Sequence, residues 1–131
     1  MNHYLELDVD DCGDIYLSIH CGSRNLGKQV CEYYQQKAIE MKKLRIKLRN
    51  ERKDILIQEC RKSGNIQKIQ FFIDSTKTKN TNEPSDELAY IYGIDLENYL
   101  NDMRLCNKWS ELNHKIIYME IMDGLEEILN D

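Results

Sequence analysis

The order of elements is decided by the stretch Ile19–Lys28, whose sequence is IHCGSRNLGK. A run of β-forming residues ends at His20, a glycine-containing turn carries Arg24, and a helical pattern begins immediately afterwards. In a strand–turn–helix arrangement, the free N–H groups at the helix N-terminus face any bound anion. Imidazole is a common metal ligand, and a guanidinium group matches phosphate oxygens in pairs. The stretch therefore predicts a turn that binds an anion or a metal ion.

Two segments that precede this turn predict a β-hairpin. Tyr4–Val9 and Ile15–His20 alternate apolar and polar residues on either side of a turn-forming cluster, Asp10–Asp14. The register that gathers the apolar side chains on one face pairs Leu5 with Ile19, Leu7 with Leu17 and Val9 with Ile15. The same register sets His20 opposite Tyr4 and His3 opposite Cys21. We therefore expect both histidines at the open end of the hairpin, with one apolar face half-buried.

The rest of the chain is expected to be mainly helical. Apolar residues spaced by three and four from Leu26 predict helix as far as Ser63–Gly64, either as one helix or as two with a break near Asn50. The segments that follow are predicted as a short strand over Gln67–Ile73, a flexible loop over Ser75–Pro84, a helical turn over Glu87–Tyr92 and a long final helix capped by Asp95.

The fold class expected from these segments is α/β (α+β), an antiparallel hairpin followed by helices. We expect a single domain over 1–131. Its parts would be a hairpin and turn at 1–24, a helical segment at 25–64, an irregular connection at 65–94 and a long helix at 95–130. Asn113 interrupts the apolar stripe of this last helix, so its amide should have hydrogen-bond partners.

Composition narrows the class of protein. The 131 residues are 41% hydrophobic and 31% charged, which is typical of a globular chain, and no apolar run is long enough to cross a bilayer. Five scattered cysteines without a C-x-x-C pair favour reduced thiols and a cytoplasmic location. The net charge of −5 argues against a protein that coats nucleic acid. Lys42–Lys53 nevertheless holds seven Lys or Arg and one acid, which predicts a solvated helix face, with RNA contact as the alternative.

One alternative reading of the decisive stretch is a phosphate-binding P-loop. Gly22, Gly27 and Lys28 match most of the Walker A spacing, and Phe71–Asp74 could be the strand that ends in a magnesium-binding acid. However, Gln29 stands where a Ser or Thr hydroxyl should hold magnesium. The P-loop motif also does not explain His20 or Arg24.

A wider match covers nearly the whole chain. The segment Asn2–Leu7 (NHYLEL), a hairpin, and then His20–Gly27 (HCGSRNLG) resemble the RtcB family of RNA-splicing ligases, in which an Asn-His-Phe-hydrophobic-Glu strand precedes a His-Ser-Gly-Ser-Arg-Gly-Leu-Gly turn. Further agreement lies in Leu88-Ala89-Tyr90, Gly93, Tyr99, Met103 and Leu112-Asn113. The stretch of about Leu44–Asn82 has no counterpart and resembles a variable helical insertion. The resemblance makes the chain a partial RtcB-like domain.

The resemblance implies an activity and a set of site residues. RtcB-like ligases join RNA 3′-phosphate or 2′,3′-cyclic phosphate ends to 5′-hydroxyl ends, using GTP and Mn²⁺ through a guanylated histidine. By this resemblance His3 and His20 would be manganese ligands, and Arg24 would hold RNA or phosphate. Asn2, Glu6 and Asn113 would contact the nucleotide. The expected RNA partners are tRNA halves or broken RNA.

Departures from the family pattern limit what the resemblance implies. Cys21, Asn25, Tyr4 and His114 stand where the family has Ser, Gly, Phe and Arg. The family's Asp and Cys ligands and its guanylated histidine have no match among these residues. We therefore expect the chain to be inactive alone and to associate with itself or with a complementary ligase fragment. The alternative functions are a non-catalytic RNA-binding or interaction module and a P-loop-like nucleotide-binding protein.

Overall fold

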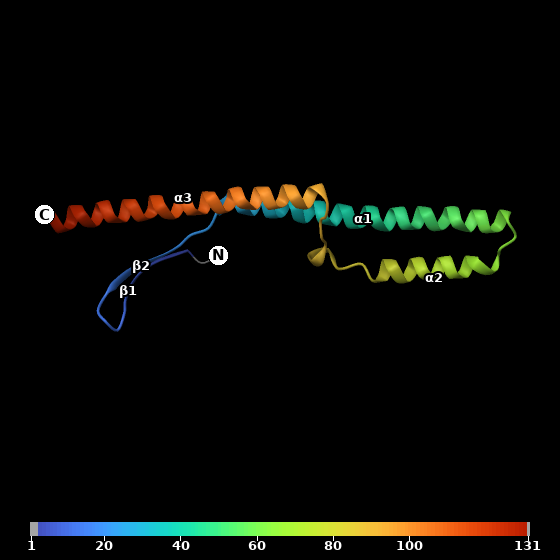
Figure 1. Ribbon diagram of the computed structural model, residues 1–131, viewed down its shortest axis with the longest axis horizontal. Coiled ribbons are helices and arrows are strands. Elements are labelled where there is room, and N and C mark those ends of the chain that lie inside the picture. Colours follow the sequence, from blue (N-terminus) through green and yellow to red (C-terminus); the bar gives the residue numbers. More distant parts are fainter. Residues whose placement is uncertain (1–2, 131) are drawn as a thin grey trace. The chain divides into compact units, whose positions relative to one another are not determined.

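The computed structural model describes residues 3–130 and has an α+β layout, as predicted. An antiparallel pair of strands, β1 (Tyr4–Val9) and β2 (Ile15–His20), leads into α1 (Arg24–Lys62). The chain continues through α2 (Gln67–Thr81) and a short 3₁₀ helix, η1 (Asp86–Leu88), to α3 (Ile94–Asn130) (Figure 1). No helix within residues 3–130 is long and apolar enough to cross a membrane.

Contacts divide the chain into two compact units, and the boundary between them falls inside α1. Unit 1 comprises Met1–Glu32 and Ile94–Asp131, and unit 2 comprises Tyr33–Gly93. Few side chains are deeply buried in either unit: Cys106 in unit 1, and Tyr34, Ala38 and Cys60 in unit 2. The division into segments given above for a single domain stays a prediction.

The hairpin of unit 1 has the predicted register. Leu5 pairs with Ile19, Leu7 with Leu17, Val9 with Ile15, and Tyr4 with His20. In the turn, the Asp10 carboxylate accepts hydrogen bonds from the N–H groups of Cys12 and Asp14, each at 2.9 Å. The backbone hydrogen bonding to Asp14 is the main reason that the pKa of Asp10 lies below its ordinary value.

The expected half-burial of the apolar face of this hairpin holds only at Leu17 and Ile19, and the rest of the face is exposed. Leu7 and Ile15 are 62% and 72% exposed, because the sheet has only two strands. Alternation therefore identified the strands and their register, while α3 contacts only part of β2 and leaves the turn end of the apolar face uncovered. A two-stranded sheet with one uncovered apolar face is marginal in water on its own.

The two interpretations left open for the long helical pattern are resolved in favour of one helix. α1 runs without a break through Asn50 and ends at Lys62. Gly64 adopts a positive φ of 75°, and the N–H of Asn65 donates to the carbonyl of Cys60 at 2.9 Å. Glycine at this position permits the left-handed turn that closes the helix, as the Ser63–Gly64 signal predicted.

The predicted strand over Gln67–Ile73 and the predicted loop over Ser75–Pro84 are both wrong. α2 occupies most of this region and lies antiparallel to α1 in unit 2 (Figure 1). Its half-buried residues Ile69, Phe72, Thr76 and Asn80 recur every three or four positions, which is a helical spacing. The hydroxyls of Thr78 and Thr81 bond the carbonyls four residues earlier, at 3.0 and 2.9 Å. This local bonding allows a polar, threonine-rich segment to be helical.

The remaining predictions for the connection to the last helix hold in part. η1 forms the turn expected within Glu87–Tyr92 but begins at Asp86. Gly93 has a φ of 62°, and α3 starts at Ile94, so Asp95 lies in the first turn and not before it. The carboxylates of Asp95 and Glu97 lie in that first turn, where they interact favourably with the positive end of the helix dipole.

A half-buried ion cluster in unit 2 corrects the expectation that Lys42–Lys53 is simply a solvated face. Arg45 and Arg49 both contact the Glu83 carboxylate, which is only 4% exposed, and the Arg45 bond is 3.0 Å long. The Arg45 guanidinium also lies 4.4 Å from the Tyr90 ring centre, while Lys42 binds Asp86 at 2.8 Å. The hydrogen bond from Arg45 is the largest cause that holds the pKa of Glu83 below its ordinary value.

Candidate functional site

The turn after β2 is held by three side chains from one face of α3. The N–H of Cys21 donates to His114 Nε2 at 3.2 Å, and Ser110 Oγ donates to the carbonyl of Cys21 at 3.3 Å. Asn113 Nδ2 donates to the carbonyl of Gly22 at 3.4 Å. Positions 110, 113 and 114 share a helix face because they are separated by three and four residues. Both polar groups of the Cys21 backbone are therefore satisfied by α3.

The hydrogen bonds of His114 define its tautomer. A backbone N–H can only donate, so Nε2 must accept the bond from Cys21. Nδ1 lies 2.7 Å from the carbonyl of Ser110, which can only accept, so the proton is on Nδ1. Both ring nitrogens of His114 are thus used to hold the turn, and neither is available to a metal ion in this arrangement.

The start of α1 is tightly built against the same turn. A Cβ placed on Gly27 would collide with the Ser23 hydroxyl and approach Ser23 Cβ to 3.2 Å. Arg24 has a φ of 57°, which costs a residue with a side chain about 1 kcal/mol. The strained residue is the one whose guanidinium is predicted to hold phosphate. Such strain is concentrated at functional sites in proteins generally.

The predicted pair of histidines shares two neighbouring pockets with Arg24. One pocket, of about 640 Å³, is lined by His3, His20 and Arg24 together with the Lys28 and Cys31 side of α1. The other, of about 300 Å³, is lined by the same three residues and by Tyr4 and Ile117. The His20 ring stacks on Tyr4, with centroids 5.0 Å apart and planes 8° apart. The open end of the hairpin therefore brings an imidazole pair and a guanidinium to one place.

The remaining predicted site residues lie at different distances from these pockets. Glu6 pairs with Ser18 on the strand face that carries Tyr4 and His20, but it lines neither pocket. Asn113 binds the backbone of the turn and has the hydrogen-bond partner that its position required. Asn2 lies outside the described residues. The assignment of these residues to metal, nucleotide and RNA stays a prediction.

The donor set fits a manganese ion only in part. Imidazole nitrogens are suitable donors for first-row divalent metals, and His3 and His20 border the same pockets. Within residues 3–130, however, no group of three or more His, Cys, Asp or Glu side chains is placed to hold a metal. Two ligands are too few for a closed site, so any tight binding needs donors from outside this set.

The P-loop alternative loses its structural context. Phe71–Asp74, proposed as the magnesium-site strand, belongs to α2. α1 already begins at Arg24, so Gly27 and Lys28 lie inside the helix and do not cradle a phosphate in a loop. Lys28 points to Glu32 on the same helix at 3.7 Å.

Sequence reasoning missed Ser110 and His114 as residues of the site. The sequence pattern gives no reason to single out Ser110, and His114 stands out only as a departure from the family pattern. One signal was available, because His114 is the residue where this chain departs from the family's Asn-Arg pair next to Asn113. A change beside a predicted site residue was a reason to expect a new contact there.

A hairpin with strand-end histidines, joined through an arginine-bearing turn to a long helix, defines the layout of this α+β chain. The family model described as tRNA-splicing ligase RtcB matches residues 1–131, which is the whole chain. The chain therefore belongs to the RtcB family. Comparison with curated proteins and with solved structures finds no match.

Proposed function

We propose that this chain supplies part of the active centre of a GTP- and Mn²⁺-dependent RNA ligase. The reaction joins RNA 3′-phosphate or 2′,3′-cyclic phosphate ends to 5′-hydroxyl ends. Membership of the RtcB family supports RNA ligation in general. The observation that carries the finer proposal is the convergence of His3, His20 and Arg24 on the same two pockets.

Each residue of this group has a role that suits its chemistry. His3 and His20 would hold Mn²⁺ through imidazole nitrogen, and the bound ion would supply Lewis-acid polarisation of a phosphate oxygen. The guanidinium of Arg24 would orient the RNA phosphate through paired hydrogen bonds. Asn2, Glu6 and Asn113 would contact the guanine nucleotide. The Tyr4 ring, stacked on His20, would fix the orientation of that imidazole.

The proposal includes the expectation that these residues do not ligate RNA alone. The two histidines are an incomplete donor set, and the resemblance assigns the guanylated histidine of the family to none of the described histidines. Ligation would therefore need the further ligands and the nucleophile from other segments or from a complementary fragment.

The test is a calorimetric titration of the full chain, first with Mn²⁺ and then with GTP. We expect weak Mn²⁺ binding that is lost in His20→Ala, and GTP binding that depends on prior addition of Mn²⁺. Ser18→Ala, on the same strand and face, is the matched control and should bind Mn²⁺ like the wild type. Equal Mn²⁺ binding by His20→Ala and wild type would overturn the metal-site assignment.

A further inference from the structure

We propose that the groove between α1 and α2 in unit 2 binds single-stranded RNA. Cationic side chains would hold its phosphates, and Phe71 would stack on a base. The site is separate from the histidine pockets and lies in the Leu44–Asn82 insertion, to which the ligase proposal gives no role. Only the choice of RNA over another single-stranded polyanion rests on the proposed function.

Charge is strongly segregated between the two units. Unit 2 contains 13 Lys and Arg against eight Asp and Glu, a net charge of +5. Unit 1 contains five against 15, a net charge of −10. The acidic total of the chain therefore hides a basic unit. A local excess of positive charge is the electrostatic signature of a surface that attracts a polyanion.

Four cations gather on one side of the seam between the helices. A pocket of about 500 Å³ is lined by Arg49, Arg52, Lys53 and Lys79, and no carboxylate lines it. Arg49 contacts Glu83, and Lys53 reaches the exposed Asp54 at 3.1 Å. Among the ion pairs of residues 3–130, none involves Arg52 or Lys79. These two side chains are therefore available to neutralise phosphates.

Aromatic side chains lie in the same pocket. Phe71 is 68% exposed although it belongs to a helix that packs against α1, and it contacts Phe72 edge-on at 5.7 Å. An exposed ring beside several cations is the arrangement used to stack an unpaired base while neighbouring charges hold its phosphate. A duplex hides its base faces, so Phe71 favours a single strand.

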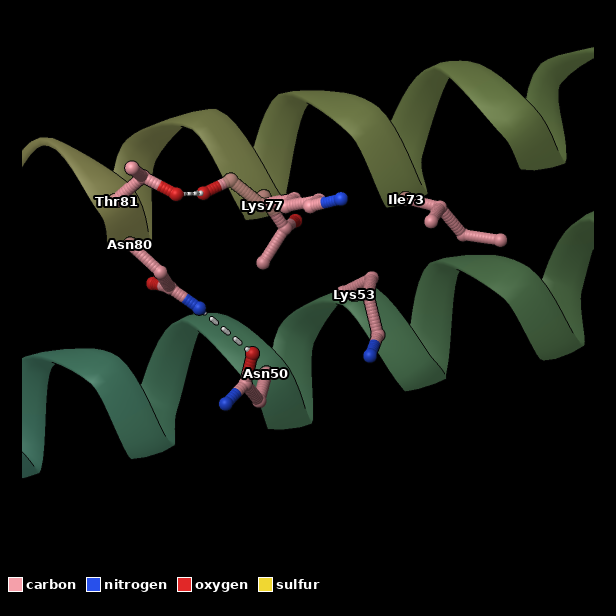
Figure 2. A pocket seen from close by; sticks show the side chains of 7 residues that line it. Asn50, Lys53, Ile73, Lys77, Asn80 and Thr81 are labelled. Carbon is pink, nitrogen blue, oxygen red and sulfur yellow. Dashed lines mark hydrogen bonds between the residues drawn. The ribbon is translucent and has the colours of Figure 1, made fainter.

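The other side of the seam is also polar and cationic. A second pocket, of about 410 Å³, is lined by Asn50, Lys53, Lys77 and Asn80 among others, and it shares Lys53 and Thr76 with the first pocket. Figure 2 looks into this pocket, where Asn80 Nδ2 donates across the helices to Asn50 Oδ1 at 3.0 Å. Lys53 lines both pockets, so positive charge borders the seam on both of its sides.

The same observations disfavour the other macromolecules that this groove could meet. A second copy that met this groove with its own groove would set two units of charge +5 against each other, which opposes that symmetric association. An acidic peptide would satisfy the cations but would leave the exposed Phe71 ring without a function. Single-stranded RNA satisfies both the charge and the ring.

The test is fluorescence anisotropy of a labelled 15-nucleotide single-stranded RNA with the full chain, in EDTA so that no metal site contributes. The groove variant is Arg52→Glu/Lys79→Glu. The matched control is Lys62→Glu/Lys68→Glu, which makes the same charge change at exposed positions of unit 2 that line none of these pockets. Circular dichroism checks that each variant retains its helix content.

We expect the groove variant to bind at least tenfold more weakly than the control. The plot of the logarithm of the association constant against the logarithm of salt concentration should become less steep by about 1.4. Each of the two lost phosphate contacts to a single strand accounts for about 0.7 of that change. Phe71→Ala should lose about fivefold or more in affinity for single strands and little for a duplex of equal length.

Equal losses in the groove and control variants would overturn the site, as would failure of the wild type to bind RNA. A groove variant that abolishes self-association while RNA affinity is unchanged would overturn it in favour of a dimer surface. His20→Ala should leave this RNA affinity unchanged, so the groove and the metal site can fail independently.

Discussion

The backbone N–H of Cys21 donates a hydrogen bond to Nε2 of His114, 93 positions further along the chain. This bond, with those from Ser110 and Asn113, sets the turn that carries Arg24 against α3. α3 thereby fixes the backbone of the turn from which the Arg24 side chain, the candidate phosphate-binding group, extends.

Replacing His114 by Ala should loosen the turn. The Cys21 N–H loses its acceptor, and a part-buried hydrogen bond of this kind contributes about 1 kcal/mol. Hydrogen exchange of the Cys21 amide should then accelerate about fivefold or more. His114→Gln, which keeps an acceptor on the same helix face, is the control and should exchange more slowly than His114→Ala. Exchange in His114→Ala at the wild-type rate would contradict the anchoring role.

Gly27→Ala should be less stable than Gly124→Ala by about 1 kcal/mol or more, because the added methyl group overlaps the Ser23 hydroxyl and forces it to turn away. The double variant Ser23→Ala/Gly27→Ala removes that oxygen and should recover part of the loss. Gly124→Ala is the matched control, since nothing lies within 4 Å of its Cβ and alanine favours a helix by about 1 kcal/mol. Urea unfolding followed by circular dichroism measures all three. A Gly27→Ala chain as stable as Gly124→Ala would refute the close contact.

The stability of unit 2 should fall in acid. The pKa of Glu83 is lowered below 4.5 in the folded chain, so its ionised form stabilises the fold above that value. The contribution is lost as the pH falls through the lower, folded-state pKa. Thermal unfolding between pH 7 and pH 3 should show a steep loss of stability below about pH 4.5 in the wild type.

Glu83→Gln provides the test of that assignment. The variant should be less stable by about 1–2 kcal/mol at pH 7, because the half-buried Arg45 and Arg49 lose the counter-charge of Glu83. It should also show a shallower dependence on pH. Glu59→Gln, an exposed carboxylate on α1, should behave like the wild type. A Glu83→Gln chain with the full acid sensitivity would place the effect elsewhere.

The parts of the structure that could be predicted from sequence are those governed by local pattern. Alternation over Tyr4–Val9 and Ile15–His20 determined the register to the residue, and Gly64 marked the end of α1. The prediction of a strand at Gln67–Ile73 is wrong because a short run of apolar and aromatic residues fits the two-residue period of a strand as well as the 3.6-residue period of a helix. The spacing of Ile69, Phe72, Thr76 and Asn80 becomes visible only across the whole of α2.

The long-range contacts of the site were beyond local reasoning for a physical reason. The bonds from Ser110 and His114 to Cys21 join positions about 90 residues apart, and no periodicity encodes such a pairing. The requirement that Asn113 be hydrogen-bonded was predictable from its place on an apolar stripe. Its partner, the carbonyl of Gly22, was not. In the same way, the basic run in α1 did not reveal that two of its arginines, Arg45 and Arg49, form ion pairs with Glu83.

The central claim is that His3 and His20 form one metal-binding centre, and NMR line broadening by substoichiometric Mn²⁺ tests it most directly. We expect the imidazole signals of His3 and His20 to broaden first. The acidic C-terminal end of α3, where Asp123, Glu126 and Glu127 line a pocket, should be affected only at higher metal concentrations. Broadening that begins at those carboxylates while both imidazole signals stay sharp would contradict the claim.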